Sequence, residues 1–237
     1  MYYIMGDIHG DTDKVFNFVD SQLLQSEDVI VLLGDVGINY FGNKYGDKYK
    51  KSFLNALGIK LFCIHGNHEM RPQNLSYYNE SIWNGGTVFV EKKYPNILFA
   101  KDGELYDFDG IGVLVIGGAY SVDKYVRISK GWAWFPDEQP SEMTKRYVEK
   151  RIKSIHHTVD VVLSHTCPMK YIPIEAFLPN IDQLNVDNST EMWLDSIENS
   201  LNYQHWYCGH WHIDKTIDKI HFVMNSVRLL NNDVDKR

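Results

Sequence analysis

The chain has 237 residues, 44% of them hydrophobic, which is enough to bury a full core, and no linker-like or repeated segment divides it. The N-terminal residues lack a signal-peptide pattern and no eighteen consecutive residues are apolar, so we expect a single domain, 1–237, in the cytoplasm, with no membrane partner and with its three cysteines reduced. The net charge of −7 excludes general attraction to nucleic acid, so an anionic substrate needs a local positive site.

The first third of the chain predicts three buried strands, each followed by a glycine and then by side chains that can bind metal. Residues 2–5 precede GDIHG, in which Asp7 and His9 are two residues apart. Residues 29–33 are continuously apolar, as in a strand buried on both faces, and end in GDVG with Asp35. The third strand ends in GNHE. The glycine lets the backbone turn sharply off each strand.

Helices are expected between these strands. Apolar residues at helical spacing predict a helix over 12–25, with Asp11 or Thr12 as its N-cap, and a second helix over 51–57. In an open α/β sheet the loops at the carboxyl ends of the strands gather on one edge. The polar side chains of the three loops should therefore converge, and carboxylate with imidazole suits Mn, Fe or Zn.

The middle third is less regular. We expect a turn at 83–86 and, over 97–121, apolar runs broken by Asp-Gly pairs that start a second, antiparallel sheet. Residues 123–140 predict no element but hold Trp132, Trp134 and Phe135. Two interpretations stay open for this aromatic loop: it packs over the core, or it forms a rim that contacts substrate or a partner.

The last third repeats the pattern of a strand followed by ligands. A basic helix over 141–157 leads to a buried strand that ends at His165, and a second strand ends at His210 and His212. A core helix over 191–201 separates them, and a closing strand follows over 221–226. The remaining histidines have no such placement and are expected to be structural or on the surface: His65, His156, His157, His205 and His221.

Five ordered motifs, GDIHG, GDVG, GNHE, a later Ser-His and a final GHWH, resemble those of the calcineurin-like metallophosphoesterases, and the match spans residues 6–212. The resemblance implies a four-layer α/β/β/α sandwich of two mixed sheets flanked by helices, with two divalent metal ions at the strand C-terminal ends. It implies that Asp7, His9 and His212 hold the first metal, that Asp35 bridges, that Asn67, His165 and His210 hold the second, and that His68 is a catalytic residue beside the leaving group.

These residue types agree with phosphoester hydrolysis. Two cations about 3.5–4 Å apart neutralise phosphoryl oxygens and lower the pKa of a bridging water, and a histidine outside the ligand set can protonate the leaving oxygen. Neutral His and Asn ligands leave net positive charge, which attracts phosphate to an acidic protein. Arg127, just before the aromatic loop, is a weaker candidate for a phosphate contact.

Differences between this chain and two branches of the family limit the activities that the resemblance implies. Phosphoprotein phosphatases follow their second Gly-Asp with Asp-Arg-Gly, whereas Ile38 and Asn39 stand at those Asp and Arg positions here. RNA lariat debranching enzymes resemble this chain more closely in layout, at Pro95 to Ile97 and in a Gly-Gly-Ala-Tyr-Ser segment, but usually have Cys where this chain has Asp7. True debranching is therefore not implied.

Three hypotheses follow. The first is a dimetal phosphodiesterase that acts on a nucleotide or nucleic-acid-like substrate. The second is a phosphomonoesterase or Ser/Thr protein phosphatase. The third is a non-catalytic interaction module on the same fold, like the retromer subunit that resembles these enzymes but has lost ligands. All seven ligand positions are filled in this chain, which disfavours the third hypothesis. The native metals, the preferred ester and the oligomeric state stay open.

Overall fold

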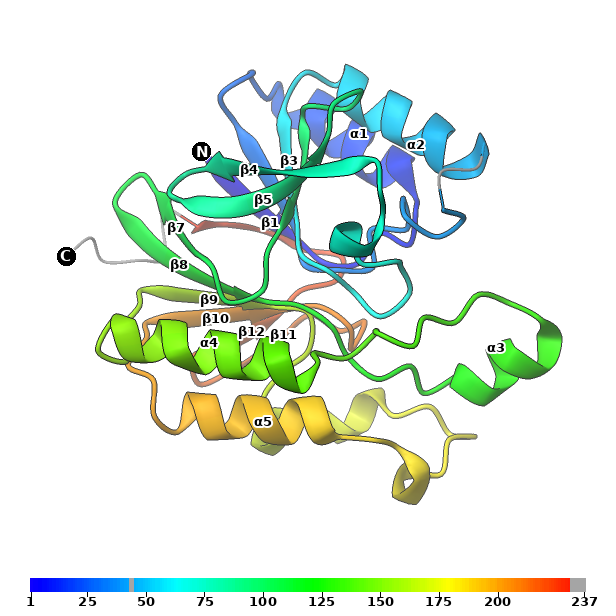
Figure 1. The fold of residues 1–237 in the computed structure, drawn as a ribbon, viewed down its shortest axis with the longest axis vertical. Coiled ribbons are helices and arrows are strands. Elements are labelled where there is room, and N and C mark those ends of the chain that lie inside the picture. The colour runs from blue at the N-terminus through cyan, green and yellow to red at the C-terminus, as the bar shows by residue number, and fades with distance from the viewer. Residues whose placement is uncertain (43–44, 231–237) are drawn as a thin grey trace.

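The computed structural model describes residues 1–42 and 45–230, and it has four layers (Figure 1). Two helices cover the outer face of a seven-stranded sheet, and two others cover the outer face of a six-stranded sheet. The helices are α1 (Thr12–Gln22), α2 (Tyr45–Ala56), α3 (Lys124–Lys130), α4 (Glu142–Ser154) and α5 (Ser189–Glu198). The predicted α/β/β/α sandwich of two mixed sheets is confirmed.

The larger sheet has the order β13-β1-β2-β3-β6-β5-β4. Its strands are β1 (Tyr2–Met5), β2 (Val29–Leu32), β3 (Lys60–Cys63), β4 (Tyr78–Trp83), β5 (Gly86–Glu91), β6 (Ile97–Ala100) and β13 (Val227–Leu229). Strands β1, β2, β3 and β6 run parallel, and the flanking strands are antiparallel. The carboxyl ends of β1, β2 and β3 therefore lie side by side on one edge.

The smaller sheet has the order β11-β12-β10-β9-β8-β7. Its strands are β7 (Leu105–Phe108), β8 (Ile111–Ile116), β9 (Val161–Ser164), β10 (His205–Cys208), β11 (Lys215–Ile217) and β12 (Ile220–Phe222). Strands β8, β9, β10 and β12 are parallel. Four short 3-10 turns complete the chain, η1 (Pro72–Asn74), η2 (Met169–Tyr171), η3 (Ile174–Ala176) and η4 (Gln183–Asn185).

Alternation along the buried strands produces the layers. Ile4, Val31 and Phe62 belong to the core between the two sheets, whereas Met5 and Leu32, one residue further along, belong to the core under α1 and α2. Successive side chains point to opposite faces of a strand, so a continuous apolar run fills both cores. Burying each such side chain contributes roughly 1.5–3 kcal/mol. The strand ends are thereby held rigidly.

Local signals set most helix ends. Asp11 caps α1, since its side chain accepts from the amides of Asp13 and Lys14, and α1 ends before the expected residue 25 because Leu23 adopts a left-handed conformation. Ser141 caps α4 by accepting from the Thr144 amide. Helix α2 begins earlier than the predicted residue 51.

Four predictions for the irregular regions were wrong in part. The turn at 83–86 is only Asn84 and Gly85, because the residues before and after them belong to the β4-β5 hairpin. The run at 97–100 is β6 of the larger sheet, so the second sheet begins at β7. Residues 124–130 form α3, which stands away from the body of the molecule (Figure 1). The closing strand expected over 221–226 is shorter, since only its first residues belong to β12, and a further strand, β13, returns to pair with β1.

The described helices include none that is both long and apolar enough to cross a membrane.

Candidate metal centre

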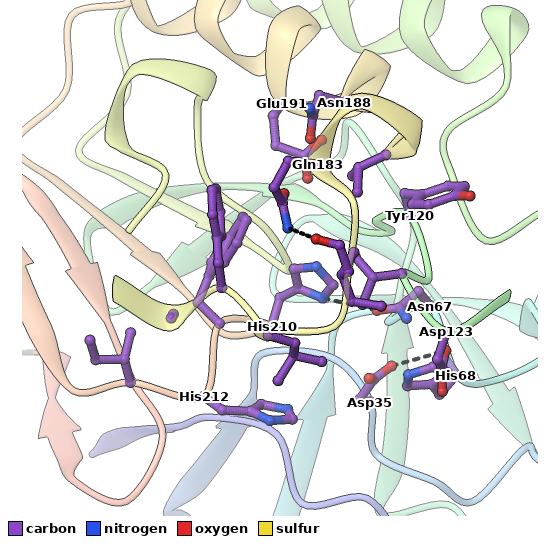
Figure 2. A pocket seen from close by; sticks show the side chains of 18 of the residues that line it. Asp35, Asn67, His68, Tyr120, Asp123, Gln183, Asn188, Glu191, His210 and His212 are labelled. Atoms are coloured by element: carbon purple, nitrogen blue, oxygen red, sulfur yellow. Dashed lines mark hydrogen bonds between the residues drawn. The ribbon is translucent and has the colours of Figure 1, made fainter. Parts of the chain in front are cut away.

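The loops that follow β1, β2, β3, β9 and β10 meet at one edge of the sandwich. They bring together the seven side chains that the sequence singled out as ligands, Asp7, His9, Asp35, Asn67, His165, His210 and His212. Because these loops come from both sheets, ligands from the first and last thirds of the chain lie side by side. Figure 2 shows His210, His212, Asn67 and Asp35 at the base of one cavity.

Asp7, His9 and His212 form the first group. Nε2 of His9 lies 2.9 Å from Nε2 of His212, and Nε2 of His212 lies 3.3 Å from Oδ2 of Asp7. Asp7 is buried, whereas the two imidazoles are partly open to the cavity. The pKa of Asp7 is lowered although burial raises it, because hydrogen bonds from His212 and from the His210 amide favour the carboxylate. An ionised carboxylate with two imidazole nitrogens fits a divalent cation.

Asn67, His165 and His210 form the second group. Oδ1 of Asn67 lies 2.8 Å from Nε2 of His165 and 3.1 Å from Nδ1 of His210. Nδ1 of His165 lies 2.7 Å from the Leu33 carbonyl oxygen, which can only accept, so Nδ1 carries the proton. In the neutral ring the Nε2 lone pair then faces Oδ1 of Asn67. Two acceptors this close repel unless a cation binds both, so this group also fits a metal.

His210 is suited to the same task. Burial lowers its pKa to about 3, and the nearby His165 acts in the same direction, so its imidazole is neutral near pH 7. A neutral imidazole is the form that coordinates metal. The position of the ring thus matches its predicted role as a ligand.

Asp35 lies between the two groups. Its Oδ2 is 3.8 Å from Nδ1 of His9, and its Oδ1 is 3.7 Å from Nε2 of His165. Asp7 is also close to ligand atoms of both groups, since it lies with His9 and His212 on one side and with Asp35 and His165 on the other. Two carboxylates at the junction suit two adjacent cations.

The backbone at this edge is strained and close-packed. His9, Asp35, His210 and His212 all have left-handed φ values, between 45° and 64°. Such conformations cost of order 1–3 kcal/mol and persist where the surroundings impose them. Gly66 has no positive φ, but a Cβ there would lie 2.1 Å from Oδ1 of Asp35. That glycine therefore provides room for a ligand rather than a sharp turn, which differs from the reason we expected.

Glu69 is a positioning residue whose role the sequence did not indicate. Its fully buried carboxyl accepts from the amides of Gly66, Val36 and Gly37 at 3.2, 3.4 and 3.3 Å. Burial, reinforced by the charge of Asp35, raises its pKa to about 8. The carboxyl ties the loop after β2 to the loop after β3 and so holds the ligands of both loops. The sequence shows that Glu69 belongs to the GNHE motif, but the three amides come together only in the folded chain.

His68 and Arg127 lie together beside the ligands. The His68 amide donates to Oδ1 of Asp35 at 2.8 Å, and its Nε2 is 3.5 Å from Nη2 of Arg127. Burial lowers the pKa of His68; the charge of Asp35 opposes this, and that of Arg127 adds to it. Arg127 is held in place by Oδ2 of Asp123, at 2.7 Å from its Nε. Both residues face the cavity.

The other histidines lie apart from this group. Nε2 of His65 is 3.1 Å from the Glu69 carbonyl oxygen, and Nδ1 of His205 is 2.9 Å from Nε2 of His221. His156 and His157 follow the end of α4. Ile38 and Asn39, at the positions where phosphoprotein phosphatases have Asp and Arg, are fully buried, and the Asn39 side chain accepts from the Tyr78 hydroxyl. They face the core instead of a substrate.

Two cavities open onto the centre. The larger, about 560 Å³, is covered by residues 175–188, which include η4 and the end of η3, and the smaller, about 330 Å³, lies beside α2 and α3. Four residues line both: His9, Asp35, His68 and Arg127. Figure 2 shows Gln183, Asn188 and Glu191 on the side of the larger cavity away from Asp35 and His68. A group bound at the centre can therefore extend in two directions.

The aromatic loop divides between the two interpretations. Phe135 is buried and packs against Tyr40, and Nε1 of Trp134 donates to Oε2 of Glu138 at 2.8 Å, so these two rings pack on the protein. Trp132 is 53% exposed and lines the smaller cavity. Only Trp132 is placed to meet a bound molecule.

Known protein families include one that matches most of this chain. A model of the family described as calcineurin-like phosphoesterase matches residues 2–214. The chain is similar to the crystal structure of TT1561 of Thermus thermophilus, with 12% identity over 94% of this chain and 87% of that one and a TM-score of 0.48. It is also similar to the sulfate thiohydrolase SoxB of Thermus thermophilus in complex with glycerol, with 13% identity over 92% of this chain and 37% of that one and a TM-score of 0.38. No curated protein sequence matches it.

Proposed function

This chain belongs to the calcineurin-like phosphoesterase family and is a metal-dependent hydrolase of phosphoesters, and we propose that its substrates are phosphodiesters of a nucleotide or nucleic-acid-like kind. One observation carries the diester proposal. The two cavities meet at His9, Asp35, His68 and Arg127, so a phosphoryl group there has room for an ester arm on each side. A monoester has a single ester arm and would fill only one of the two cavities.

The ligand set of this proposal follows the two groups of donors. Asp7, His9 and His212 would hold one divalent ion, Asn67, His165 and His210 would hold the other, and Asp35 would contact both. When bound, the two ions supply positive charge to the phosphoryl oxygens and an activated water. The donor set of carboxylate, imidazole and amide oxygen suits Mn, Fe or Zn.

Side chains of the protein would then donate a proton, bind the phosphoryl group and orient a ligand. As a water oxygen bonds to phosphorus and releases a proton to the solvent, the bond between phosphorus and the leaving oxygen would break, and His68 in its protonated form would donate a proton to that oxygen and regain one from the solvent. Arg127 would hold a non-bridging phosphoryl oxygen, since Asp123 fixes its guanidinium beside His68. The Leu33 carbonyl keeps the proton of His165 on Nδ1, which leaves Nε2 free to coordinate.

The test compares two chromogenic esters with the metal-reconstituted protein. We expect bis-p-nitrophenyl phosphate to be hydrolysed with a higher kcat/KM than p-nitrophenyl phosphate, with Mn, Fe and Zn each assayed after chelation. A preference for the monoester would replace this proposal with a phosphomonoesterase. No turnover of either ester by any metal form would favour the interaction module.

A further inference from the structure

The two cavities differ sharply in charge. We call the larger one the apolar compartment: apart from the central residues, its walls are mostly Val122, Phe177, Leu178, Ile181, Val186 and Trp211. Its acidic groups away from the centre are the carboxyls of Glu175, which forms an ion pair with Lys215, and of the buried Glu191, and among the described residues no cation lies beside them in the lining. The smaller one we call the basic compartment, since Lys50 is the charged group that it adds to the shared central residues. An anionic arm is favoured only in the second.

Lys50 is placed like a ligand for an anion. Its Nζ donates to the Gly37 carbonyl oxygen at 3.3 Å, and a Cβ on Gly10 would lie 2.0 Å from it, so the ammonium sits over the loops that follow β1 and β2. Within 1–42 and 45–230, no carboxylate forms an ion pair with it. An ammonium has three donors, and the Gly37 carbonyl accepts one of them. The remaining donors are available to a bound group.

Aromatic rings complete the basic compartment. Tyr40, Phe41 and Trp132 line it with Lys50. Phe41 and Trp132 are 46% and 53% exposed, so part of each ring is open to a molecule in this compartment. Exposed rings beside a cation are the arrangement that binds nucleotides, because bases stack on the rings while the cation meets a phosphate.

We infer that the basic compartment binds a nucleoside arm that carries a second phosphate, with Lys50 as the residue that selects for that phosphate, while the apolar compartment takes an uncharged leaving arm. This inference rests on the proposed phosphodiesterase function. It narrows the substrate from phosphodiesters in general to those with an additional phosphate beyond the scissile one. Such a substrate resembles an internal nucleotide of a single strand, or a nucleoside bisphosphate ester.

The experiment uses two diesters that differ in one phosphate: thymidine 5′-(p-nitrophenyl phosphate) and the same compound with a 3′-phosphate. Both release p-nitrophenolate on cleavage of its bond to phosphorus. The ratio of their kcat/KM values is measured within each protein, so partial loss of folded or metal-loaded protein cancels. In the wild type we expect the 3′-phosphate to raise kcat/KM by about tenfold or more, mainly through KM.

Three variants locate the effect. Lys50→Met should bring the ratio close to one, and Lys50→Arg should retain most of it because the charge stays. Lys48→Met removes an exposed lysine of the same helix that lines neither cavity, and it should keep the wild-type ratio. Higher salt should lower the wild-type ratio.

The results separate the two proposals. A wild-type ratio of one or less, or an unchanged ratio in Lys50→Met, overturns the role of Lys50 while hydrolysis of bis-p-nitrophenyl phosphate still supports the phosphodiesterase. Cleavage of that simple diester without cleavage of either thymidine ester overturns the nucleoside arm. If no diester is cleaved, the proposed function fails and this inference fails with it.

Discussion

The strand ends and the segments around them are built in opposite ways. The proposed ligands Asp7, Asp35, Asn67 and His165 are buried at the ends of central strands, and each makes short polar contacts. The walls of the two compartments come instead from 37–41, Lys50, 120–132 and 175–191, together with Trp211 and Ile213, and α3 and the turns η3 and η4 leave apolar side chains exposed there. This difference indicates that the rigid strand ends position the side chains that would carry out the reaction, whereas the segments around them form the surfaces that contact a substrate.

The largest effect should follow from a change at the strand ends. Asp35→Asn keeps the acceptor for the His68 amide and tolerates the left-handed backbone, but it removes the charge between the two ligand groups. We expect metal content to fall and kcat/KM to drop roughly 10⁴-fold or more. Metal analysis and turnover of bis-p-nitrophenyl phosphate measure both.

The matched control is His156→Asn, an exposed histidine just after α4 that also has a left-handed φ. It should change neither metal content nor rate. Full activity in the Asp35 variant would show that the metal centre has been wrongly assigned. In the wild type, chelation should abolish turnover and added Mn or a similar ion should restore it.

The second effect tests His68, at the border between the strand ends and the walls. If His68 donates a proton to the leaving oxygen, His68→Ala should keep both metals and lose on the order of 10²–10⁴ in rate. Esters with an alkoxide leaving group should suffer most, because p-nitrophenolate needs little protonation. A loss of metal, or equal losses for both kinds of ester, would contradict the acid role.

The third effect concerns Glu191, in the wall of the apolar compartment. Its Oε1 accepts from the Thr166 hydroxyl at 2.8 Å, and burial raises its pKa to about 7. The Glu191 carboxyl therefore stays protonated in the folded chain up to about pH 7, whereas in the unfolded chain it loses its proton above about pH 4.5. The free energy of unfolding therefore falls as the pH rises from about 4.5 to about 7. Since one pKa unit is worth about 1.4 kcal/mol, the loss should be on the order of 3 kcal/mol.

Glu191→Gln keeps the acceptor and removes the proton equilibrium. Denaturant unfolding should give the variant and the wild type similar stability at pH 4.5, and the variant should be more stable by a few kcal/mol at pH 8. Glu142→Gln, an exposed carboxyl in the first turn of α4, should follow the wild-type curve. Parallel curves for all three proteins would show that Glu191 is ionised in the folded chain.

The smallest effect separates the two tryptophans of the aromatic loop, of which only Trp132 lines a cavity. Trp132→Ala should raise KM for the thymidine diester roughly fivefold or more, because stacking on a base is worth about 1–3 kcal/mol. Trp134→Ala should leave KM unchanged and lower Tm, since that ring bonds Glu138 and lies under the ammonium of Lys124. An unchanged KM in the Trp132 variant would indicate that the whole aromatic loop only packs over the core.

Local pattern made the strand ends predictable. Each of the loops with ligands follows a short apolar run, and such a run buried on both faces reads as a central strand from its residues alone. Asp7 with His9, and His210 with His212, are neighbours in sequence, so their nearness needs no fold. The motif order also identified the sandwich, which the structure confirms.

Distances between remote residues were beyond the sequence. Asp7 and His212 are 205 positions apart and meet only because β1 and β10 end at the same edge. Lys50 precedes the helix that the sequence predicts over 51–57, and no role was predicted for it, whereas Glu191 belongs to the predicted core helix. Only packing turns Lys50 toward the loop glycines and buries Glu191. Residues 124–130 lack the apolar stripe of a core helix, since α3 packs on no sheet. The sequence by itself therefore determined the strands and the ligand types, because both depend on neighbours along the chain. The tertiary structure alone decided the two compartments and their charge, because these depend on contacts between distant segments.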